Sequence, residues 1–178
     1  MDQLAGHVLI VSGSPGSGKT TVAEALARRP GTPKVHLHSD DFWGYIKHGH
    51  IDPWLPEAAD QNRMVMEIAA GVAALYARNG YLTVLDGVIG PWSLPPFRTL
   101  DVPVHYIVLR VPVEQAVARC QARGGDSLTD PAVVANLHGQ FADLGDRETH
   151  MLQVDGLDRE GTLAALLEAV QNRDFRLA

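Results

Sequence analysis

Short apolar runs alternate with amphipathic stretches along most of the chain. The apolar runs predict parallel strands, because strands buried on both faces are hydrophobic throughout. Stretches with apolar residues three or four positions apart predict helices between them. Strands are expected at residues 7–12, 34–39, 81–86, 104–110 and 151–155. This alternation indicates an α/β fold in which helices cover both faces of a parallel sheet.

The longest predicted helix covers residues 56–78, and Asn79-Gly80 is a typical helix stop. Its apolar stripe has helical spacing and consists of Met64, Ile68, Val72 and Leu75. Further helices are expected at residues 20–29, 112–123, 131–144 and 162–172.

A glycine-rich loop joins the first strand to the first helix. Its sequence GSPGSGKT, at residues 13–20, fits the phosphate-binding pattern G-x-x-x-x-G-K-[ST]. The glycines permit a sharp turn and a close approach of the backbone, and the following helix points its positive end at a bound phosphate. A dinucleotide-binding fingerprint does not fit this spacing and leaves Lys19 unexplained. We therefore expect ATP to bind Gly13, Ser14, Pro15, Gly16, Ser17, Gly18, Lys19, Thr20 and Thr21.

Carboxylates stand where the second and third predicted strands end. Asp40 and Asp41 follow the second strand, and Asp86 ends the third. Open α/β sheets bind their ligands at this edge. We expect Thr20 and Asp86 to form the Mg²⁺ site, with Asp86 holding the water shell of the metal. The alternatives are a helix cap for Asp40 and Asp41 and a strand-end turn for Asp86.

Several residues near this edge are candidates for substrate contacts, and each is alternatively an ordinary surface or core residue. Arg63 stands near the start of the long helix, where it could reach a substrate anion. The loop at residues 87–92 is a candidate pocket wall. The irregular segment 44–55 contributes Tyr45, Lys47, His48, His50 and Trp54. The predicted substrate residues are Asp41, Trp43, Arg63 and Gly87.

Arg119 and Arg123 lie four positions apart, on one face of a predicted helix, before the glycine-rich residues 124–127. Two arginines in front of a flexible loop are typical of a small lid over phosphates, here around residues 119–130. The alternative is that they are ordinary charges at the end of a helix.

Composition narrows the possible partners and the compartment. The 178 residues are 46 % hydrophobic, which suits a single domain over residues 1–178. The net charge of -6 argues against a nucleic-acid partner held by general electrostatics. Cys120 is the single cysteine, so an internal disulfide is excluded. No signal-peptide pattern or membrane-length apolar run is evident, and a cytoplasmic monomer or homodimer is expected.

These motifs resemble the P-loop kinases of small molecules, the nucleoside-monophosphate-kinase-like group. That resemblance implies a three-layer P-loop NTPase fold with a five-stranded parallel sheet in the order 2-3-1-4-5. Residues 40–43 are similar to the D-[DS]-F-[YF] segment of uridine and nicotinamide riboside kinases, which implies that Asp40 is the base. Residues 119–123 resemble the lid arginines of adenylate kinases, which implies that Arg119 packs on adenine and Arg123 binds ATP phosphates.

The layout is similar to that of chloramphenicol phosphotransferase and, more loosely, gluconate kinase. This likeness implies transfer of the γ-phosphoryl group of ATP, with Mg²⁺, to a hydroxyl of a small molecule, with Lys19, Asp40 and Arg123 as catalytic residues. Two alternatives stay open. One is an ATP-binding regulator without acceptor chemistry. The other is a nucleoside monophosphate kinase, which needs several arginines around the acceptor phosphate, and only Arg63 and Arg98 stand near the right loops.

Overall fold

The computed structural model describes residues 4–123, 128–171 and 175–177. Its centre is a sheet of five strands that pair in parallel, in the order β2-β3-β1-β4-β5. The predicted α/β fold and strand order are therefore confirmed. The strands are β1 (Val8–Gly13), β2 (Lys34–His38), β3 (Leu82–Gly87), β4 (Val104–Arg110) and β5 (Met151–Gln153).

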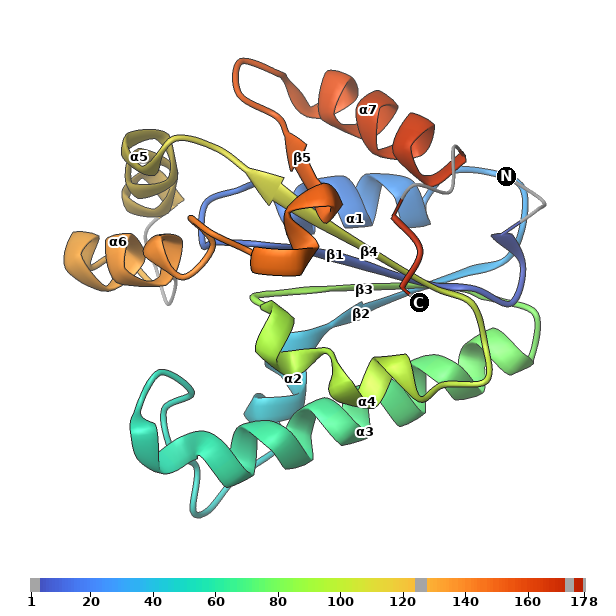
Figure 1. The fold of residues 1–178 in the computed structure, drawn as a ribbon, viewed down its shortest axis with the longest axis horizontal. Helices are drawn as coiled ribbons and strands as arrows, with labels where there is room; N and C mark the ends of the chain where they lie inside the picture. The colour runs from blue at the N-terminus through green and yellow to red at the C-terminus, as the bar shows by residue number, and fades with distance from the viewer. Residues whose placement is uncertain (1–3, 124–127, 172–174, 178) are drawn as a thin grey trace.

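Helices cover both faces of this sheet (Figure 1). On one face lie α1 (Lys19–Ala27) and α7 (Arg159–Gln171), and on the other lie α3 (Ala59–Arg78) and the short α4 (Pro95–Arg98). Beyond the carboxyl ends of the central strands lie α5 (Val113–Arg123) and α6 (Pro131–Gly139), next to each other (Figure 1). The shorter elements are α2 (Ser39–Gly44), η2 (Pro56–Ala58), η3 (Pro91–Ser93) and η4 (Gly145–His150).

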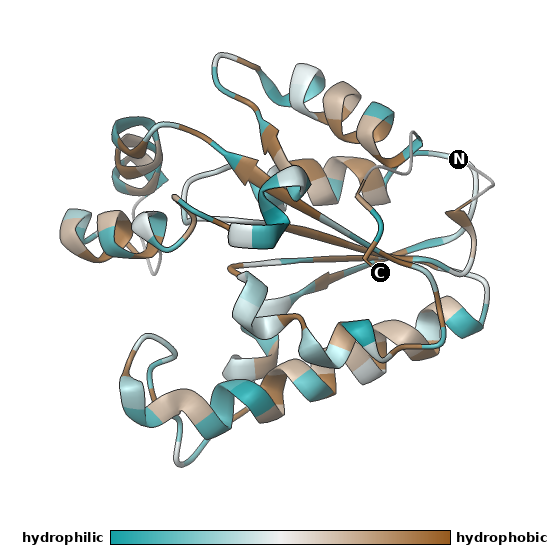
Figure 2. Cartoon of the chain, viewed as in Figure 1, coloured by the Kyte–Doolittle hydropathy of each residue, from teal (hydrophilic) through white to brown (hydrophobic). Residues whose placement is uncertain are grey.

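The strand residues divide between two hydrophobic cores. In β1, Leu9 and Val11 pack in the core that α1 and α7 cover, and Val8 and Ile10 pack in the core beneath α3. This alternation follows from the two-residue period of a strand. Because both faces are buried, the central strands are mostly apolar (Figure 2), and polar residues such as Ser12 and Asp86 stand near their carboxyl ends. A rigid sheet buried in this way fixes the loops at its carboxyl edge.

The long helix is present, but the face that packs on the sheet is not the stripe that predicted it. Met64, Ile68 and Leu75 are 43–58 % exposed. The buried face consists of Val65, Met66, Ala69, Ala70, Ala73, Ala74 and Ala77. Small side chains let the helix approach the sheet so closely that the Thr83 hydroxyl donates to the Ala73 carbonyl, at 3.2 Å.

Other boundaries also differ from the predictions. The helix expected to reach residue 144 ends at Gly139, because Phe141 and Leu144 turn into the core beneath α3. The loop predicted at residues 87–92 ends in η3, which begins at Pro91, and α4 follows at Pro95. Residue 172, the expected end of the last helix, lies outside the described residues. In the described part of the chain, no helix has the length and apolar character needed to cross a bilayer.

Candidate active site

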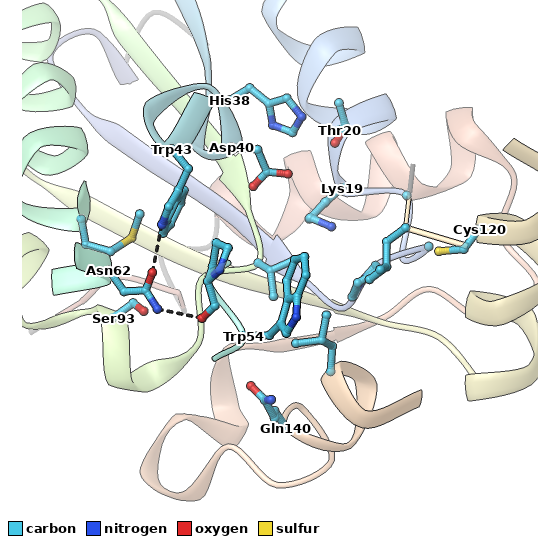
Figure 3. A pocket seen from close by; sticks show the side chains of 18 of the residues that line it. Lys19, Thr20, His38, Asp40, Trp43, Trp54, Asn62, Ser93, Cys120 and Gln140 are labelled. Carbon is cyan, nitrogen blue, oxygen red and sulfur yellow. Dashed lines mark hydrogen bonds between the residues drawn. The ribbon is translucent and has the colours of Figure 1, made fainter. Parts of the chain in front are cut away.

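A cavity of about 710 Å³ opens at the carboxyl edge of the sheet. The glycine-rich loop and the start of α1 form one end of it, with Lys19 and Thr20. Another part is lined by the indoles of Trp43, Trp54 and Trp92. Figure 3 shows that Lys19 and Asp40 point into the same space from different elements. The expected phosphate loop and the expected acid therefore lie in one cavity.

The loop is packed so tightly at Gly13 and Gly16 that neither glycine can be replaced without movement. A Cβ atom on Gly13, whose φ is 146°, would lie 2.5 Å from the Leu109 carbonyl oxygen. A Cβ on Gly16, at a φ of 78°, would overlap the backbone of Ala116 in α5. The buried Ser17 hydroxyl has no hydrogen-bond partner among the described residues. A tight cradle with an unpaired hydroxyl fits a bound phosphate.

The ammonium of Lys19 is enclosed by this loop. Its Nζ donates to the Ser14 carbonyl oxygen at 3.2 Å, and the side chain is buried. Burial lowers the pKa of Lys19 below its ordinary value, and the negative charges of Asp40 and Asp86 partly offset this effect. A desolvated ammonium that donates to a carbonyl oxygen and has further N–H groups to donate is well suited to bind a phosphate anion.

Asp86 is fixed by three side chains. The hydroxyl of Thr20 donates to its Oδ2 at 2.5 Å, His36 Nε2 lies 2.7 Å from its Oδ1, and His38 Nδ1 lies 3.3 Å from the same atom. Burial opposes ionisation of Asp86, but these three contacts outweigh it and hold its pKa well below the ordinary value. The contact with Asp86 raises the pKa of His38 to about 9. Asp86 is therefore an oriented carboxylate.

The residues expected to hold Mg²⁺, Thr20 and Asp86, are in direct contact. Hard oxygen donors of this kind suit Mg²⁺, which keeps several waters and binds substrate phosphates as well. The described residues contain no group of three His, Cys, Asp or Glu side chains that could hold a metal ion alone. The oxygen atoms of Thr20 and Asp86 are the part of this site whose chemistry fits Mg²⁺.

The two adjacent acids are placed differently. Asp40 lines the cavity, whereas Asp41, also on α2, is not among its described lining residues. Ser39 donates to Asp40 Oδ1 at 3.3 Å. A Cβ on Gly87 would overlap the Ser39 hydroxyl, so Gly87 lets α2 sit against the end of β3. Gly87, expected at the substrate, is not among the described lining residues, and it makes room for the helix that carries Asp40.

The two arginines of the expected lid, Arg119 and Arg123, have different positions relative to the cavity. Arg123 lines the cavity, and Arg119 donates to the Gly16 carbonyl oxygen at 3.3 Å from outside it. Residues 124–127 of the expected lid lie outside the described residues. Arg63 is not brought into the cavity: it is exposed and pairs with Asp60 and Glu67 on its own helix.

Comparison with known proteins places this architecture in a family. Residues 8–144 match the family model AAA_33, described as AAA domain. The chain belongs to this family. Its fold and phosphate loop are those of P-loop kinases of small molecules, which confirms the resemblance noted in the sequence.

Two curated relatives of this AAA-domain protein are cytidylate kinases. The one from Pyrobaculum aerophilum is 30 % identical over 133 residues, which cover 69 % of this chain and 64 % of the relative. The one from Pyrobaculum calidifontis is 32 % identical over 120 residues, which cover 67 % and 62 %. The chain thus spans less than two thirds of the length of either relative.

Solved structures share the fold over nearly the whole chain. A sugar kinase from Janibacter sp. HTCC2649 has a TM-score of 0.66 and 20 % identity, covering 93 % of this chain and 94 % of its own. A gluconokinase from Sinorhizobium meliloti 1021 has a TM-score of 0.65 and 18 % identity, covering 94 % and 95 %. Identities this low establish the common fold alone.

Several residues of the site in this AAA-domain protein were not predicted from the sequence. His36 and His38 have a detectable signal, because alternate strand residues share a face and β3 pairs His38 with Asp86. Asn62 and Met66 are one helical turn apart, so a helical pattern places them on one face. No sequence pattern marks Ser93 or Gln140 as a cavity residue. Of the segment 44–55, Pro53 and Trp54 line the cavity. Tyr45, Lys47, His48 and His50 are not among the described lining residues.

Proposed function

We propose that this protein transfers the γ-phosphoryl group of ATP, with Mg²⁺, to a hydroxyl group of a small molecule. The observation that carries the proposal is the position of Asp40, a carboxylate in the same cavity as the phosphate loop. The cytidylate kinase relatives and the kinase folds support phosphoryl transfer.

The nucleotide end of the cavity supplies charge and orientation. The loop and Lys19 would hold the β- and γ-phosphates, and Arg123 would neutralise charge on the group that moves. Thr20 and Asp86 would hold Mg²⁺, which, when bound, neutralises the phosphates of ATP. His36 and His38 keep the Asp86 carboxylate in one orientation.

Asp40 completes the chemistry at the acceptor. Its carboxylate would accept the proton of the acceptor hydroxyl while that oxygen forms a bond to the γ-phosphorus. The bond from the γ-phosphorus to the bridging oxygen breaks at the same time, and ADP leaves with the electron pair. A hydroxyl is a poor nucleophile at neutral pH, so a positioned base accelerates this step by roughly 10²- to 10⁴-fold.

A nucleoside monophosphate kinase is the second candidate, because the curated relatives are cytidylate kinases. Such an enzyme must bind an acceptor phosphate, for which arginines are the usual ligands. Among the described lining residues, Arg123 is the only arginine, and it ends α5, the helix beside the phosphate loop. This charge distribution favours an acceptor without a phosphate.

The proposal is tested with ATP that carries ¹⁸O in its γ-phosphate. The protein is incubated with this ATP, Mg²⁺ and the small-molecule fraction of a cell extract, and labelled phosphate esters are sought by mass spectrometry. We expect label in an organic product with wild-type protein and none with Lys19→Ala. Tight ATP binding without any labelled ester would support the ATP-binding regulator instead.

A further inference from the structure

The cavity changes character between its two ends. Besides His38, the cationic residues among the described lining residues are Lys19 and Arg123. Lys19 belongs to the phosphate loop, and Arg123 belongs to α5 beside that loop. Away from the loop, the lining consists of three indoles, apolar side chains and the neutral polar groups of Asn62, Ser93 and Gln140. Figure 3 shows Trp43, Asn62 and Ser93 grouped on the side away from Cys120.

Trp43, Trp54 and Trp92 form an aromatic wall of the cavity. The part with Trp43 and Trp54 is held in place by two neighbouring side-chain amides of α3, those of Asn62 and Gln61. The indole nitrogen of Trp43 donates to Asn62 Oδ1 at 2.9 Å, and Asn62 Nδ2 donates to the Pro53 carbonyl oxygen at 2.8 Å. Gln61 binds both the N–H and the carbonyl of Ile51, at 3.2 and 2.7 Å. These bonds tie α2 and the loop that carries Trp54 to one rigid helix, so this wall is built before a ligand arrives.

Trp92 completes the aromatic lining from another element. A Cβ on Gly90 would overlap the Trp92 ring, so glycine at residue 90 lets the ring take its present position. The ring lies at 57° to Phe141, with 5.8 Å between their centroids. Trp92 is nevertheless 56 % exposed, and Trp54 is 52 % exposed. Large aromatic surfaces left open in a cavity are suited to cover a ligand.

We propose that the acceptor is an uncharged alcohol with a flat or apolar body, held against Trp43, Trp54 and Trp92; this rests on the proposed function. Asn62 is the positioning residue, because it orients Trp43 and the backbone next to Trp54. An anionic acceptor would face the Asp40 carboxylate and lose hydration without gaining a described lysine or arginine at that end. Stacking on indoles is available to any planar neutral body.

The charge of the acceptor is tested by dividing the small molecules of the extract on an anion-exchange resin. The neutral and anionic pools are incubated separately with ¹⁸O-labelled ATP and the wild-type protein. We expect the labelled ester in the reaction with the neutral pool. Label confined to the anionic pool, or to an added oligonucleotide with a 5′-hydroxyl, would overturn the inference and leave phosphoryl transfer itself intact. Label in no reaction would refute the proposed function, and the inference with it.

The aromatic wall is tested by kinetics with the acceptor so obtained. Trp54→Ala should raise its KM by roughly tenfold or more, with the KM for ATP unchanged. Tyr76→Ala is the control, because Tyr76 is a similarly exposed aromatic residue of α3 that does not line the cavity. Equal effects of both variants, or an effect of Trp54→Ala on ATP alone, would contradict the aromatic wall.

Asn62→Ala is expected to raise the same KM without changing the KM for ATP. If Asn62 only stabilised the fold, its replacement would disturb the handling of the acceptor and of ATP together. Asn79→Ala is the matched control, because Asn79 also bonds a backbone carbonyl, that of Leu75, but at the other end of α3. A KM for the acceptor that responds equally to both variants would show that Asn62 has no positioning role.

Discussion

The hydroxyl of Thr20 and the carboxylate of Asp86 are joined by a hydrogen bond of 2.5 Å, although 66 positions separate them in the chain. The bond links the first turn of α1 to the end of β3. His36 and His38 hold the other oxygen of the same carboxylate. A Mg²⁺ ion bound at Thr20 would therefore meet a carboxylate whose orientation is already fixed.

Asp86→Asn should weaken ATP binding in the presence of Mg²⁺ by roughly 10- to 100-fold and leave metal-free ATP binding nearly unchanged. The amide removes the charge, and because it has one oxygen in place of two it cannot accept from both His36 and Thr20. Calorimetric titration of ATP with and without Mg²⁺ measures the difference. Asp101→Asn, at an exposed carboxylate paired with Arg78, is the control. Equal losses with and without Mg²⁺ would speak against a role in metal binding.

Lys19→Ala should reduce the affinity for ATP by at least roughly 30-fold, because it removes the buried cation of the loop. Removing a desolvated charge should not unfold the chain, so the circular dichroism spectrum should stay unchanged. Calorimetry on the folded variant provides the measurement. Wild-type affinity for ATP would show that the loop does not bind phosphates through this residue.

Gly87→Ala should slow phosphoryl transfer without lowering ATP affinity. The new Cβ would overlap Ser39 and displace the start of α2, where Asp40 stands. The double variant Gly87→Ala with Ser39→Gly removes the overlapping atoms and should recover part of the rate. A single variant with an unchanged rate would show that the contact between Gly87 and Ser39 does not position Asp40.

The close packing of the buried face of α3 on the sheet predicts how substitutions in this helix change the stability of the fold. Ala73→Leu should lower the free energy of unfolding by roughly 1–3 kcal/mol, because Ala73 is fully buried against β3. Leu75→Ala should change it by no more than about 0.5 kcal/mol, because Leu75 is 58 % exposed. Urea unfolding of both variants gives the two values. The reverse order would mean that the apolar stripe is the face that packs on the sheet.

The sequence predicted the sheet well and one helix face poorly. Apolar strands such as β1 and β4 are recognisable because both of their faces are buried. The strand order was predicted from the resemblance to P-loop kinases of small molecules. The face of α3 was misjudged because hydrophobicity ranks leucine above alanine. Close helix–sheet packing instead selects small side chains such as Ala73.

The candidate site was predictable only where a local motif marked it. Lys19 and Thr20 lie within one continuous pattern, and Asp86 ends a clear strand. Gln140 and Asn62 reach the cavity through tertiary packing between elements far apart in the chain, which no local pattern encodes. Arg63 looked available in the sequence, but Asp60 and Glu67 on the same helix hold it at the surface.

The central claim is that Asp40 is the base of a kinase. The most direct test is single-turnover transfer from ATP to the identified acceptor by wild-type protein, Asp40→Asn and Asp41→Asn, with ATP affinity measured alongside. Asp40→Asn is nearly isosteric but cannot take the proton, so transfer should fall by roughly 10²- to 10⁴-fold with ATP affinity nearly unchanged. Asp41→Asn should have a much smaller effect. Transfer at the wild-type rate by Asp40→Asn would contradict the claim.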